Sequence, residues 1–459
     1  MKPGANAAKS DFSIGPVWRQ ILSQAVPLTI AEIVQLLYNV VDRVYLGHLS
    51  ATDSLALTGV GLVFPIISIV GAFTSLYGSG GAPLFAIARG AGEEEKAARL
   101  ENMVFALLLG TSIVMMAAVY GFMRPILFLF GASEASWPYA ADYMRIYMLG
   151  TPFTMLATGL NGFINAQGNP RVGMGTILLG AGMNLLLDPL FIFVLNMGIA
   201  GAAWATVISQ AVSCLWVLRF LTGKKALFPL RVRHMRISLP LLKSILSLGI
   251  VGFIMKGTNA LVQAACNSTL QVWGGELYVG VMTVVNSVRD ILFLPVSGIT
   301  GGAQPVMSYN YGAKKPQRVK KGIVFTTALT VGYTLISWLA VLLFPGMFMS
   351  IFTNDPETLR VGAGVLRIYF FGFFFQAFQS AGQATFQSLG DAKHAIFFSL
   401  LRKAVIVTPL ALLLPGWGFG VNGVFIAEPV SNVVGGLACY ITMLLTVYKK
   451  KLSGSNPEQ

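Results

Sequence analysis

Charged residues are scarce in this chain: they make up 11% of its 459 residues, with 18 Asp and Glu and 3 His. Soluble domains carry about 25% charged residues, so this shortage excludes a water-soluble fold of this length. Cysteine is also rare. Cys214, Cys266 and Cys439 each lie inside an apolar segment, which excludes a disulfide framework and predicts small buried side chains with no metal between them.

Sequence signals of catalysis are missing as well. There is no Ser/His/Asp set, HExxH or CxxC motif, and His48, His234 and His394 lie near the joints between apolar stretches, where we expect ordinary surface residues. There is also no GxxxxGK[ST] phosphate loop, and no polar stretch is long enough to form a nucleotide-binding domain. We therefore expect neither an enzyme nor a primary pump, and no cofactor.

Long apolar stretches dominate the chain instead. Its mean hydropathy is +0.70, and 55% of its residues are hydrophobic. Apolar segments of about 20 residues or more follow one another with short polar joints, and each can cross a hydrocarbon core about 30 Å thick. We predict an all-α integral membrane protein with twelve transmembrane helices, at residues 17–46, 57–88, 97–125, 137–166, 171–195, 200–221, 240–271, 277–310, 318–345, 357–388, 393–414 and 420–448.

The basic residues follow the topology of these helices. Most of the 32 Lys and Arg lie in the N-terminal leader, in the joints after even-numbered helices or in the tail, for example Lys314, Lys315 and Lys449–Lys451. The positive-inside rule then predicts that both termini are cytoplasmic, and the charge indicates no nucleic-acid partner. The leader lacks the layout of a cleavable secretory signal, so we expect the first helix to direct insertion.

An internal repeat appears when the sequence is shifted by 222 residues against itself. The shift aligns "RGAG" (89–92) with "YGAK" (311–314), "RIY" (145–147) with "RIY" (367–369), and "GIAGAAWATVISQ" (198–210) with "GVNGVFIAEPVSN" (420–432). Because each repeat holds six helices, both halves enter the membrane in the same sense, which predicts two parallel lobes related by an axis along the membrane normal. We expect the following organisation: leader 1–16, N-lobe 17–221, linker 222–239, C-lobe 240–448 and tail 449–459.

Buried carboxylates are the clearest functional signal in such a chain. In "MNLLLDPLFIF" (183–193), Asn184 and Asp188 share one face of the fifth helix, and Pro189 frees backbone carbonyl groups and is an expected hinge. Thr206 on the sixth helix lies at a similar depth. The first helix bears a polar stripe of Glu32, Gln35, Asn39 and Asp42, with Tyr38 beside it and a second expected hinge at Pro27.

We predict an ion-coupling site formed by Asp42, Asp188, Asn184, Thr206, Tyr38 and Asn39. Oxygen ligands of this kind suit Na⁺, and desolvated carboxylates bind protons readily. Apart from a Na⁺ ion held by Asp42, Asn184, Asp188 and Thr206, we expect no metal. A buried structural network is the alternative, but the repeat places Ile406 and Leu410 opposite Asn184 and Asp188, and an architectural network would more plausibly occur twice.

The second half carries other polar groups at membrane depth. We expect Glu32, Gln35, Asp290, Arg289, Lys256, Gln376, Gln379, Arg402 and Glu428 to line a substrate cavity. Two alternatives stay open. Asp290 could instead form an interhelical ion pair with Arg402 or Lys403, and Gln376, Gln379, Gln383 and Gln387 could tie helices together by hydrogen bonds.

These motifs resemble those of the multidrug and toxic compound extrusion (MATE) family along the whole chain: "YNVVDRVYLG" on the first helix, "GNPR…GMNLLLDPLFIF" around the fifth and "GIAGAAWATVIS" on the sixth. The resemblance implies a two-lobed, cation-coupled antiporter of a prokaryotic inner membrane that expels amphipathic, mainly cationic compounds. The family's functional residues in branches with an acidic N-lobe match Asp42, Asn184, Asp188 and Thr206. The family's C-lobe glutamate has no match here, because the seventh helix carries only Lys256.

From these observations we expect a monomeric antiporter that exchanges a small amphipathic substrate for H⁺ or Na⁺. A flippase for an anionic lipid-linked saccharide is the rival, in which Lys256, Arg289, Arg402 and Lys403 would hold phosphate. A passive channel is a weaker rival, since buried carboxylates in one half suit alternating access better.

Overall fold

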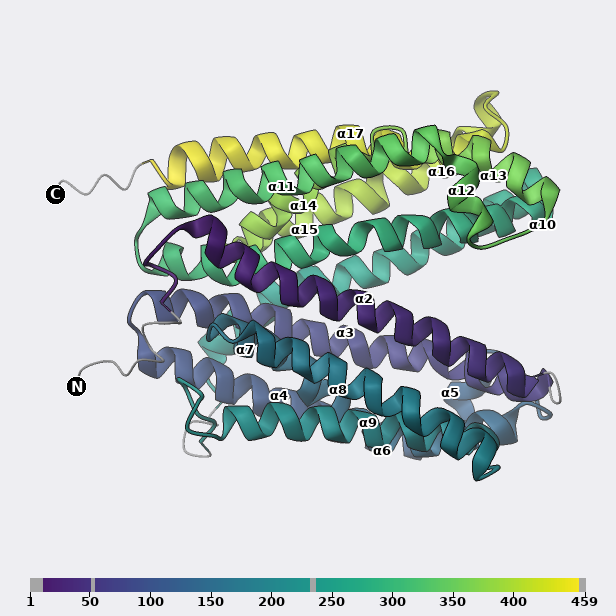
Figure 1. The fold of residues 1–459 in the computed structure, drawn as a ribbon, viewed down its shortest axis with the longest axis horizontal. Coiled ribbons are helices and arrows are strands. Elements are labelled where there is room, and N and C mark those ends of the chain that lie inside the picture. Colours follow the sequence, from purple (N-terminus) through teal and green to yellow (C-terminus); the bar gives the residue numbers. More distant parts are fainter. Residues whose placement is uncertain (1–10, 51–53, 232–236, 454–459) are drawn as a thin grey trace. The chain divides into compact units, whose positions relative to one another are not determined.

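The computed structural model of the chain describes residues 11–50, 54–231 and 237–453; for residues 42–50, 54–58, 256 and 260 it describes the backbone alone. Within these ranges the protein consists of helices and their connections, with no β-strand (Figure 1). Apolar segments form helices because a backbone in hydrocarbon must satisfy its own hydrogen bonds. The predicted all-α class is confirmed.

Six long helices make up the first half of the chain. Short helices, α5 (Met123–Leu129) and α7 (Asn161–Ala166), and a π-helical segment, η1 (Leu190–Val194), complete it. The long helices are α2 (Val17–Ser50), α3 (Ser54–Gly90), α4 (Glu94–Gly121), α6 (Trp137–Gly159), α8 (Pro170–Pro189) and α9 (Gly198–Leu221).

The second half begins with α10 (Leu239–Gly312), which breaks at Gly275, where φ is 71°. α11 (Pro316–Leu343) and the short α12 (Pro345–Ser350) follow, and then α13 (Pro356–Tyr369) and α14 (Phe373–Ser388), which meet at a bend of 49°. The remaining elements are α15 (Ala392–Leu400), the π-helical η3 (Leu401–Val407), α16 (Thr408–Leu413), the one-turn η4 (Pro415–Trp417), α17 (Asn422–Met443) and its π-helical continuation η5 (Leu444–Lys451).

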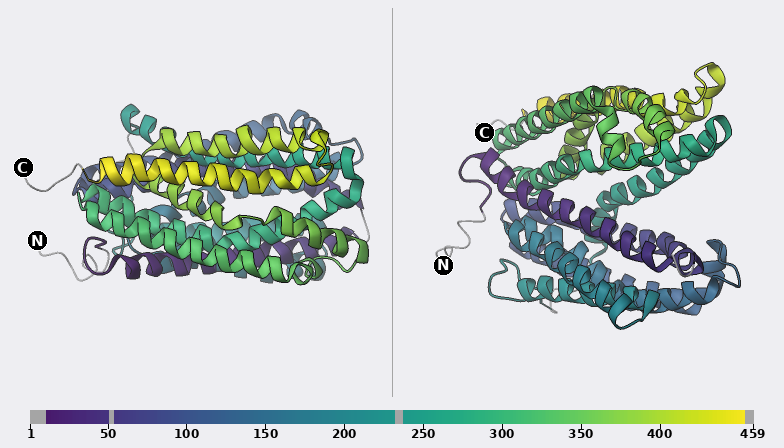
Figure 2. Two further views of the ribbon diagram at one scale, coloured as in Figure 1. Left: turned by 90° about the horizontal axis from the view of Figure 1, so that it is seen from above. Right: turned by 45° about the vertical axis from the view of Figure 1, so that its right-hand side comes forward.

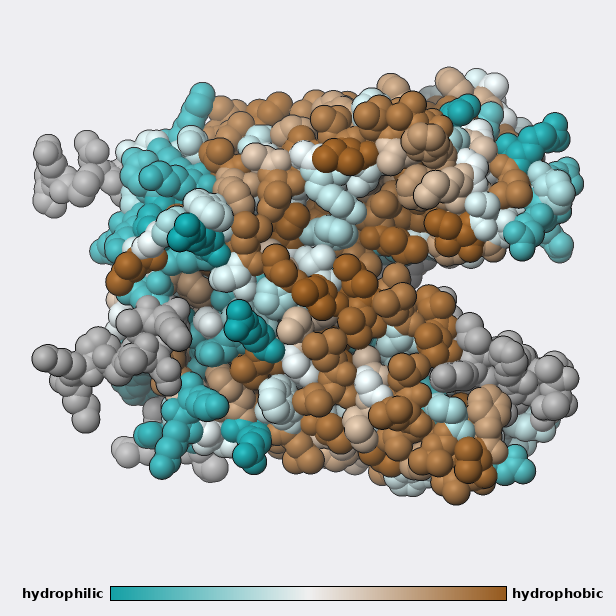
Figure 3. All heavy atoms as spheres, in the orientation of Figure 1, coloured by the Kyte–Doolittle hydropathy of each residue, from teal (hydrophilic) through white to brown (hydrophobic). Residues whose placement is uncertain are grey.

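The described helices provide the predicted twelve spans. Nine are long and apolar enough to cross a membrane, and the bent pair α13–α14 makes a tenth. The break at Gly275 divides the 74-residue α10 into two spans, and the 23 residues of α6 are sufficient for one more. On the face shown in Figure 3, apolar side chains cover the middle of the helices and polar ones gather at their ends, as lipid requires.

The repeat is visible in the helix bounds. α4 and α11 are shifted by the same 222 residues at both of their ends, and so are the first residues of α8 and α15. The π-helical segments break this correspondence. η1 begins directly after Pro189 in the first repeat, whereas η3 begins at an earlier equivalent position in the second repeat. The two halves therefore share one helix plan and differ where their buried polar groups lie.

The helices form two compact units. The first contains Ile30–Gly249, and the second contains Phe12–Thr29 and the residues from Ile250 onward. In the first unit α6 packs against α3 and α9, and α8 packs against α9; in the second, α14 packs against α11 and α17. Figure 2 shows the helices from two further sides. Each unit has its own apolar interior, centred on fully buried phenylalanines such as Phe163 and Phe370.

The beginning of α2 belongs to the second unit and packs closely on α10. A Cβ on Gly302 would lie 2.4 Å from the backbone nitrogen of Ala25, so the glycine is required for this approach. The buried Pro27 lies inside α2, two residues before the helix passes from one unit to the other. The predicted hinge at Pro27 thus coincides with the end of this close packing.

Candidate functional site

The polar residues of α8 and α9 form a buried cluster in the first unit. Asn184 and Asp188 are both almost fully buried and lie one turn apart on α8, and Thr206 on α9 is half-buried. Asn184 Nδ2 donates to Thr206 Oγ1 at 3.5 Å, and the Thr206 hydroxyl donates to the carbonyl oxygen of Ala202 at 2.9 Å. Asn184 and Thr206 therefore contact each other, and Asp188 lies one turn further along the same face of α8.

The cluster contains a buried acceptor without a donor. The side-chain oxygen Oδ1 of Asn184 is buried and has no hydrogen-bond partner among the described residues. A buried polar atom without a partner is costly, and it commonly indicates a missing proton donor, water or ion. No three His, Cys, Asp or Glu come together as a metal site in the described ranges.

The cluster is shaped by the close approach of α9 to η1. A Cβ on Gly201 would lie 2.7 Å from the carbonyl oxygen of Phe191, so only glycine permits this spacing. Pro189 ends the regular α-helical pattern because it has no N–H to donate, and the chain continues in the wider π-helical turn of η1. π-helical turns inside α-helices often lie at functional sites.

The stripe on α2 is partly visible. Gln35 Nε2 donates to Asn39 Oδ1 at 3.2 Å, as expected for residues four apart on one helix face. Glu32 and Tyr38 are half-buried, and Asn39 is exposed. The side chain of Asp42 lies outside the described residues, although its backbone is helical. Its proximity to Asp188 stays a prediction.

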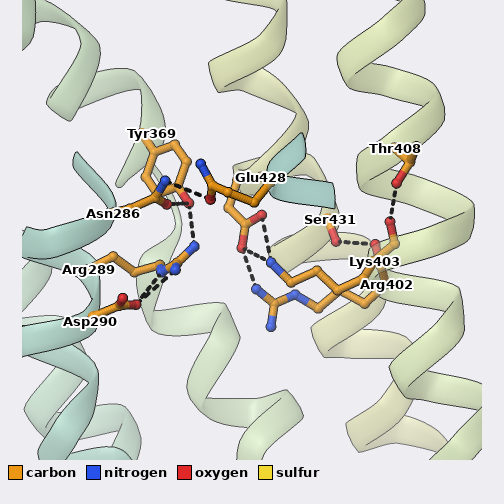
Figure 4. A network of polar contacts seen from close by, with 10 residues as sticks. Asn286, Arg289, Asp290, Tyr369, Arg402, Lys403, Thr408, Glu428 and Ser431 are labelled. Carbon is orange, nitrogen blue, oxygen red and sulfur yellow. Dashed lines mark hydrogen bonds and ion pairs between the residues drawn. The ribbon is translucent and has the colours of Figure 1, made fainter. Parts of the chain in front are cut away.

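The second unit contains a stronger ionic network, shown in Figure 4. Glu428 on α17 is buried and accepts from Arg402 Nη2 and from Lys403 Nζ, the latter at 3.2 Å to each carboxylate oxygen. Arg402 and Lys403 both lie in η3. The hydroxyl of Ser431 donates to the Arg402 carbonyl and that of Thr408 to the Lys403 carbonyl, which satisfies these oxygens within the π-helical turn.

Asp290 has a different partner from the one predicted. Its carboxylate accepts from Arg289, the preceding residue, at 2.8 Å and 3.0 Å. The alternative that Asp290 forms an interhelical ion pair with Arg402 or Lys403 is therefore wrong. The physical reason is that Glu428 lies across from both η3 cations and is much more buried than Asp290, whose side chain is 61% exposed.

A hydrogen-bond relay continues from Arg289. The Tyr369 hydroxyl accepts from Arg289 Nη1 at 3.0 Å and donates to Asn286 Oδ1 at 3.4 Å. Asn286 Nδ2 in turn donates to Gln263 Oε1 at 2.9 Å. Because a guanidinium has only donors, it sets the direction of the whole relay. The sequence predicts no site role for Tyr369, Asn286 and Gln263, because isolated polar residues on apolar helices do not indicate which partners they meet.

A cavity of about 290 Å³ lies within this network. Three of the residues expected in a substrate cavity, Arg289, Asp290 and Glu428, line it together with Lys403. Arg402 contacts Glu428 but does not line this cavity, and neither do Glu32, Gln35, Gln376 and Gln379. The side chain of Lys256 lies outside the described residues. Whether any of these residues touch substrate stays a prediction.

Two of the four glutamines of α14 form the contacts between helices that were the open alternative for this row. Gln383 Nε2 donates to the Ala395 carbonyl at 2.9 Å and to Ser399 Oγ at 2.6 Å, and Gln387 accepts from Gln304 at 3.3 Å. These two tie helices together. Gln376 and Gln379 are buried, and their side-chain oxygens have no hydrogen-bond partner within the described ranges.

One buried acid could not be predicted from the sequence. Glu101 on α4 is fully buried and accepts from Gln167 Nε2 at 2.9 Å and 3.2 Å, while Gln167 Oε1 accepts from the backbone N–H of Leu227 at 2.8 Å. This contact holds the segment after α9 against the first unit. In the sequence, Glu101 is one of several acids after "RGAG" that look like a solvated helix start, so nothing marked it as buried.

Comparison with known proteins gives a consistent result. The sequence model of the MatE family matches residues 27–190 and 253–413. The multidrug export protein MepA of Staphylococcus haemolyticus is 24% identical over 440 residues, which cover 95% of this chain and 94% of that protein. MepA of Staphylococcus aureus is 21% identical with similar coverage.

Solved structures share the fold. A MATE crystal structure in complex with MaD3S has a TM-score of 0.91 and 22% identity, and covers 99% of this chain and 100% of that one. An outward-facing multidrug resistance MATE transporter of the MOP superfamily has a TM-score of 0.89 and 22% identity, with 99% of both chains covered. The resemblance to this family that the sequence predicts is confirmed.

Proposed function

This chain belongs to the MatE family, and from that premise we propose that it is a secondary active antiporter that exports amphipathic, mainly cationic drugs or toxins in exchange for H⁺ or Na⁺. The chain is a multi-pass membrane transporter and not an enzyme. The multidrug character in the proposal comes from the names of its staphylococcal relatives. The proposed working form is a monomer in a prokaryotic inner membrane with both termini in the cytoplasm.

The observation that supports this proposal is the buried cluster of Asn184, Asp188 and Thr206. A carboxylate that is 1% exposed lies one helical turn from an amide whose oxygen Oδ1 lacks a partner. Either coupling ion would satisfy that oxygen. A proton on Asp188 would provide a hydrogen-bond donor, and Na⁺ would bind the oxygens of all three side chains, with Asp42 as a further ligand.

The ion would drive export by favouring one conformation. In the proposal, the ion enters from outside, binds near Asp42 and Asp188, and changes the packing of α2, so that substrate is released outward. Substrate then binds again from the cytoplasmic side after the ion has left. The energetics require only that ion and substrate prefer opposite conformations of the transporter. Pro27 and Pro189 are the proposed hinges of this change.

The test is export of ethidium from proteoliposomes under a pH gradient or a Na⁺ gradient, each imposed separately. The gradient that drives export identifies the coupling ion. We expect Asp188→Asn to lower gradient-driven export at least about tenfold, because a neutral amide can neither carry the proton nor offer a charged ligand to Na⁺. Asp42→Asn should have the same effect.

Asp142→Asn is the matched control. Asp142 is an exposed acid of the same unit, paired at the surface with Arg145 at 3.1 Å, and its loss should leave export unchanged. If Asp188→Asn exported ethidium at the wild-type rate under both gradients, the ion-coupling role of the cluster would be refuted.

The second candidate is the flippase for an anionic lipid-linked saccharide. One observation favours it: Arg289, Arg402 and Lys403 outnumber their two carboxylate partners in the second unit. Binding of a polyprenyl phosphate to the purified protein, with no binding of ethidium, would support the flippase over the exporter.

A further inference from the structure

The cavity in the second unit has cations on two facing walls. Arg289 reaches it from α10, and Lys403 reaches it from η3; Figure 4 shows these two side chains pointing toward one another. Among the described side chains, three cationic groups and two carboxylates make up the network around it, since Glu428 is shared by Arg402 and Lys403 while Asp290 pairs with Arg289. One positive charge is therefore left without its own counter-charge.

Lys403 is the cation that is free to bind a second anion. Arg402 makes the shorter contact with Glu428 and lies outside the lining of the cavity, so Glu428 is neutralised even without Lys403. Lys403 Nζ is 3.2 Å from both oxygens of Glu428, which is long for a charge-assisted hydrogen bond. Its side chain is 15% exposed and lines the cavity.

The remaining walls favour a small amphipathic molecule. Val262, Met282, Val407 and Val424 supply an apolar surface beside the cations. The relay through Tyr369 and Asn286 holds the polar wall in one arrangement. The volume of about 290 Å³ lies at the lower limit of small-molecule sites, which measure about 300–1,000 Å³. A lipid-linked saccharide is far larger than this cavity.

We propose that this cavity binds a small amphipathic carboxylate anion, whose carboxylate pairs with Lys403 while Arg402 keeps Glu428 neutralised. The apolar body of the ligand packs against the valines. Export of the bound ligand rests on the proposed function, whereas binding of the ligand does not. It extends the substrate class beyond the cations that the acidic first unit suggests.

Binding to the purified full chain in phosphatidylcholine nanodiscs tests this, with no gradient, by isothermal titration calorimetry. The probes are 2-naphthoate and 2-naphthylmethylammonium, which share the same ring system and differ in the sign of charge. We expect saturable binding of 2-naphthoate that Lys403→Met weakens at least about tenfold, because the variant removes the cation that pairs with the ligand carboxylate in a largely buried site. Lys403→Arg should largely restore it.

Lys393→Met is the matched control, because Lys393 is exposed on the neighbouring α15 and does not line the cavity. Its binding of 2-naphthoate should equal that of the unmodified chain. Since no transport is measured, a failure of ion coupling does not affect the result. Equal binding of both probes, or unchanged 2-naphthoate binding by Lys403→Met, would overturn the proposal.

A further arm distinguishes a lipid headgroup from a free carboxylate. The titration is repeated in nanodiscs containing phosphatidylglycerol. Binding of 2-naphthoate that persists supports the small-molecule site. The opposite result has two parts: phosphatidylglycerol abolishes 2-naphthoate binding by the unmodified protein, and Lys403→Met abolishes binding of phosphatidylglycerol. Together they would show that the lipid headgroup occupies the cavity, and the small-molecule assignment would be refuted.

Discussion

At the scale of single residues, the second unit depends on Glu428 more than on any cation around it. This one carboxylate contacts Arg402 and Lys403, and all three side chains are largely buried. Charges in a medium of low dielectric constant are tolerable only when paired. Removing the Glu428 carboxylate leaves Arg402 and Lys403 as neighbouring buried cations without this counter-charge. Removing Lys403 still leaves Arg402 paired with Glu428.

The stability of two variants should reflect this difference. Glu428→Gln should destabilise the protein strongly, by about 3–5 kcal/mol if the site behaves like other broken buried ion pairs. Lys403→Met should cost much less. Thermal unfolding of the purified variants measures this, and Glu357→Gln, at an exposed acid, is the control. An unchanged melting temperature for Glu428→Gln would contradict the buried network.

Gln167 shows how one uncharged residue can organise its surroundings. Its amide donates to Glu101 and accepts from the backbone of Leu227, which lies at the start of the segment joining the two repeats. Arg231 N–H also donates to Asn102 Oδ1 at 2.7 Å. This part of the joining segment is therefore attached to the first unit by hydrogen bonds rather than being a free linker.

At the scale of elements, the spacing of α9 and η1 decides how Thr206 meets Asn184. A methyl group on Gly201 would clash with backbone atoms of η1, which cannot move away as a flexible side chain would. The hydrogen bond between Asn184 and Thr206 is already long at 3.5 Å. A small displacement of α9 would therefore separate the cluster.

Gly201→Ala should lower both thermal stability and gradient-driven ethidium export. Gly182→Ala is the matched control, since a Cβ on Gly182 in α8 meets nothing within 4 Å. There the added methyl group should be neutral or slightly stabilising, because alanine loses less backbone entropy in a helix than glycine does. Equal behaviour of the two variants would show that the α9–η1 spacing is not critical.

The start of α13 gives a prediction about pH. Asp355 caps this helix: its Oδ2 accepts from the Thr358 N–H at 2.8 Å and from the Thr358 hydroxyl. These hydrogen bonds, from the Thr358 side chain first, lower the pKa of the Asp355 carboxyl from its ordinary value of 3.8. Because the folded-state pKa is lowered, the charged cap is fully present above pH 3.8, the ordinary pKa. The cap is lost only when the pH falls through the lower pKa of the folded state.

Amide hydrogen exchange across Pro356–Tyr369 should therefore show the same protection at pH 8 and at pH 5, after correction for intrinsic rates. Asp355→Ala should reduce protection in the first turn at both pH values, because Thr358 loses its acceptor. Protection that already decreased between pH 8 and pH 5 would contradict a lowered pKa.

At the scale of the whole molecule, the parallel repeat and the basic loops predict the orientation of the chain. The three native cysteines are all buried, so introduced cysteines can be labelled against a low background. Lys224 and Glu134 are exposed and belong to loops at opposite ends of the predicted spans.

A membrane-impermeant maleimide should label Lys224→Cys only in everted vesicles and Glu134→Cys only in intact cells. The reason is that positively charged loops stay in the cytoplasm during insertion. If Lys224→Cys were labelled only in intact cells and Glu134→Cys only in everted vesicles, the predicted topology would be reversed. If both sites were labelled from the same side, the predicted number of spans between them would be wrong.

The sequence by itself determined the helices, their number, and the resemblance to the family. A hydrocarbon solvent leaves an apolar stretch of 20 or more residues little choice but to form a helix, so the predicted spans agree with the observed bounds to within a few residues. Asn184 and Asp188 could be placed on one face for the same reason, because the spacing of residues along a helix is a local property.

Only the tertiary structure decided which charges meet. The two partners of Glu428 are set by the rotation and spacing of α17 and η3. The π-helical turn that holds Arg402 and Lys403 has no counterpart in the first repeat. The burial of Glu101 against Gln167, and the packing of the start of α2 with the second unit, depend likewise on contacts between distant segments. Hydropathy describes what surrounds a helix on average, whereas an ion pair depends on the position of a few atoms on two helices at once.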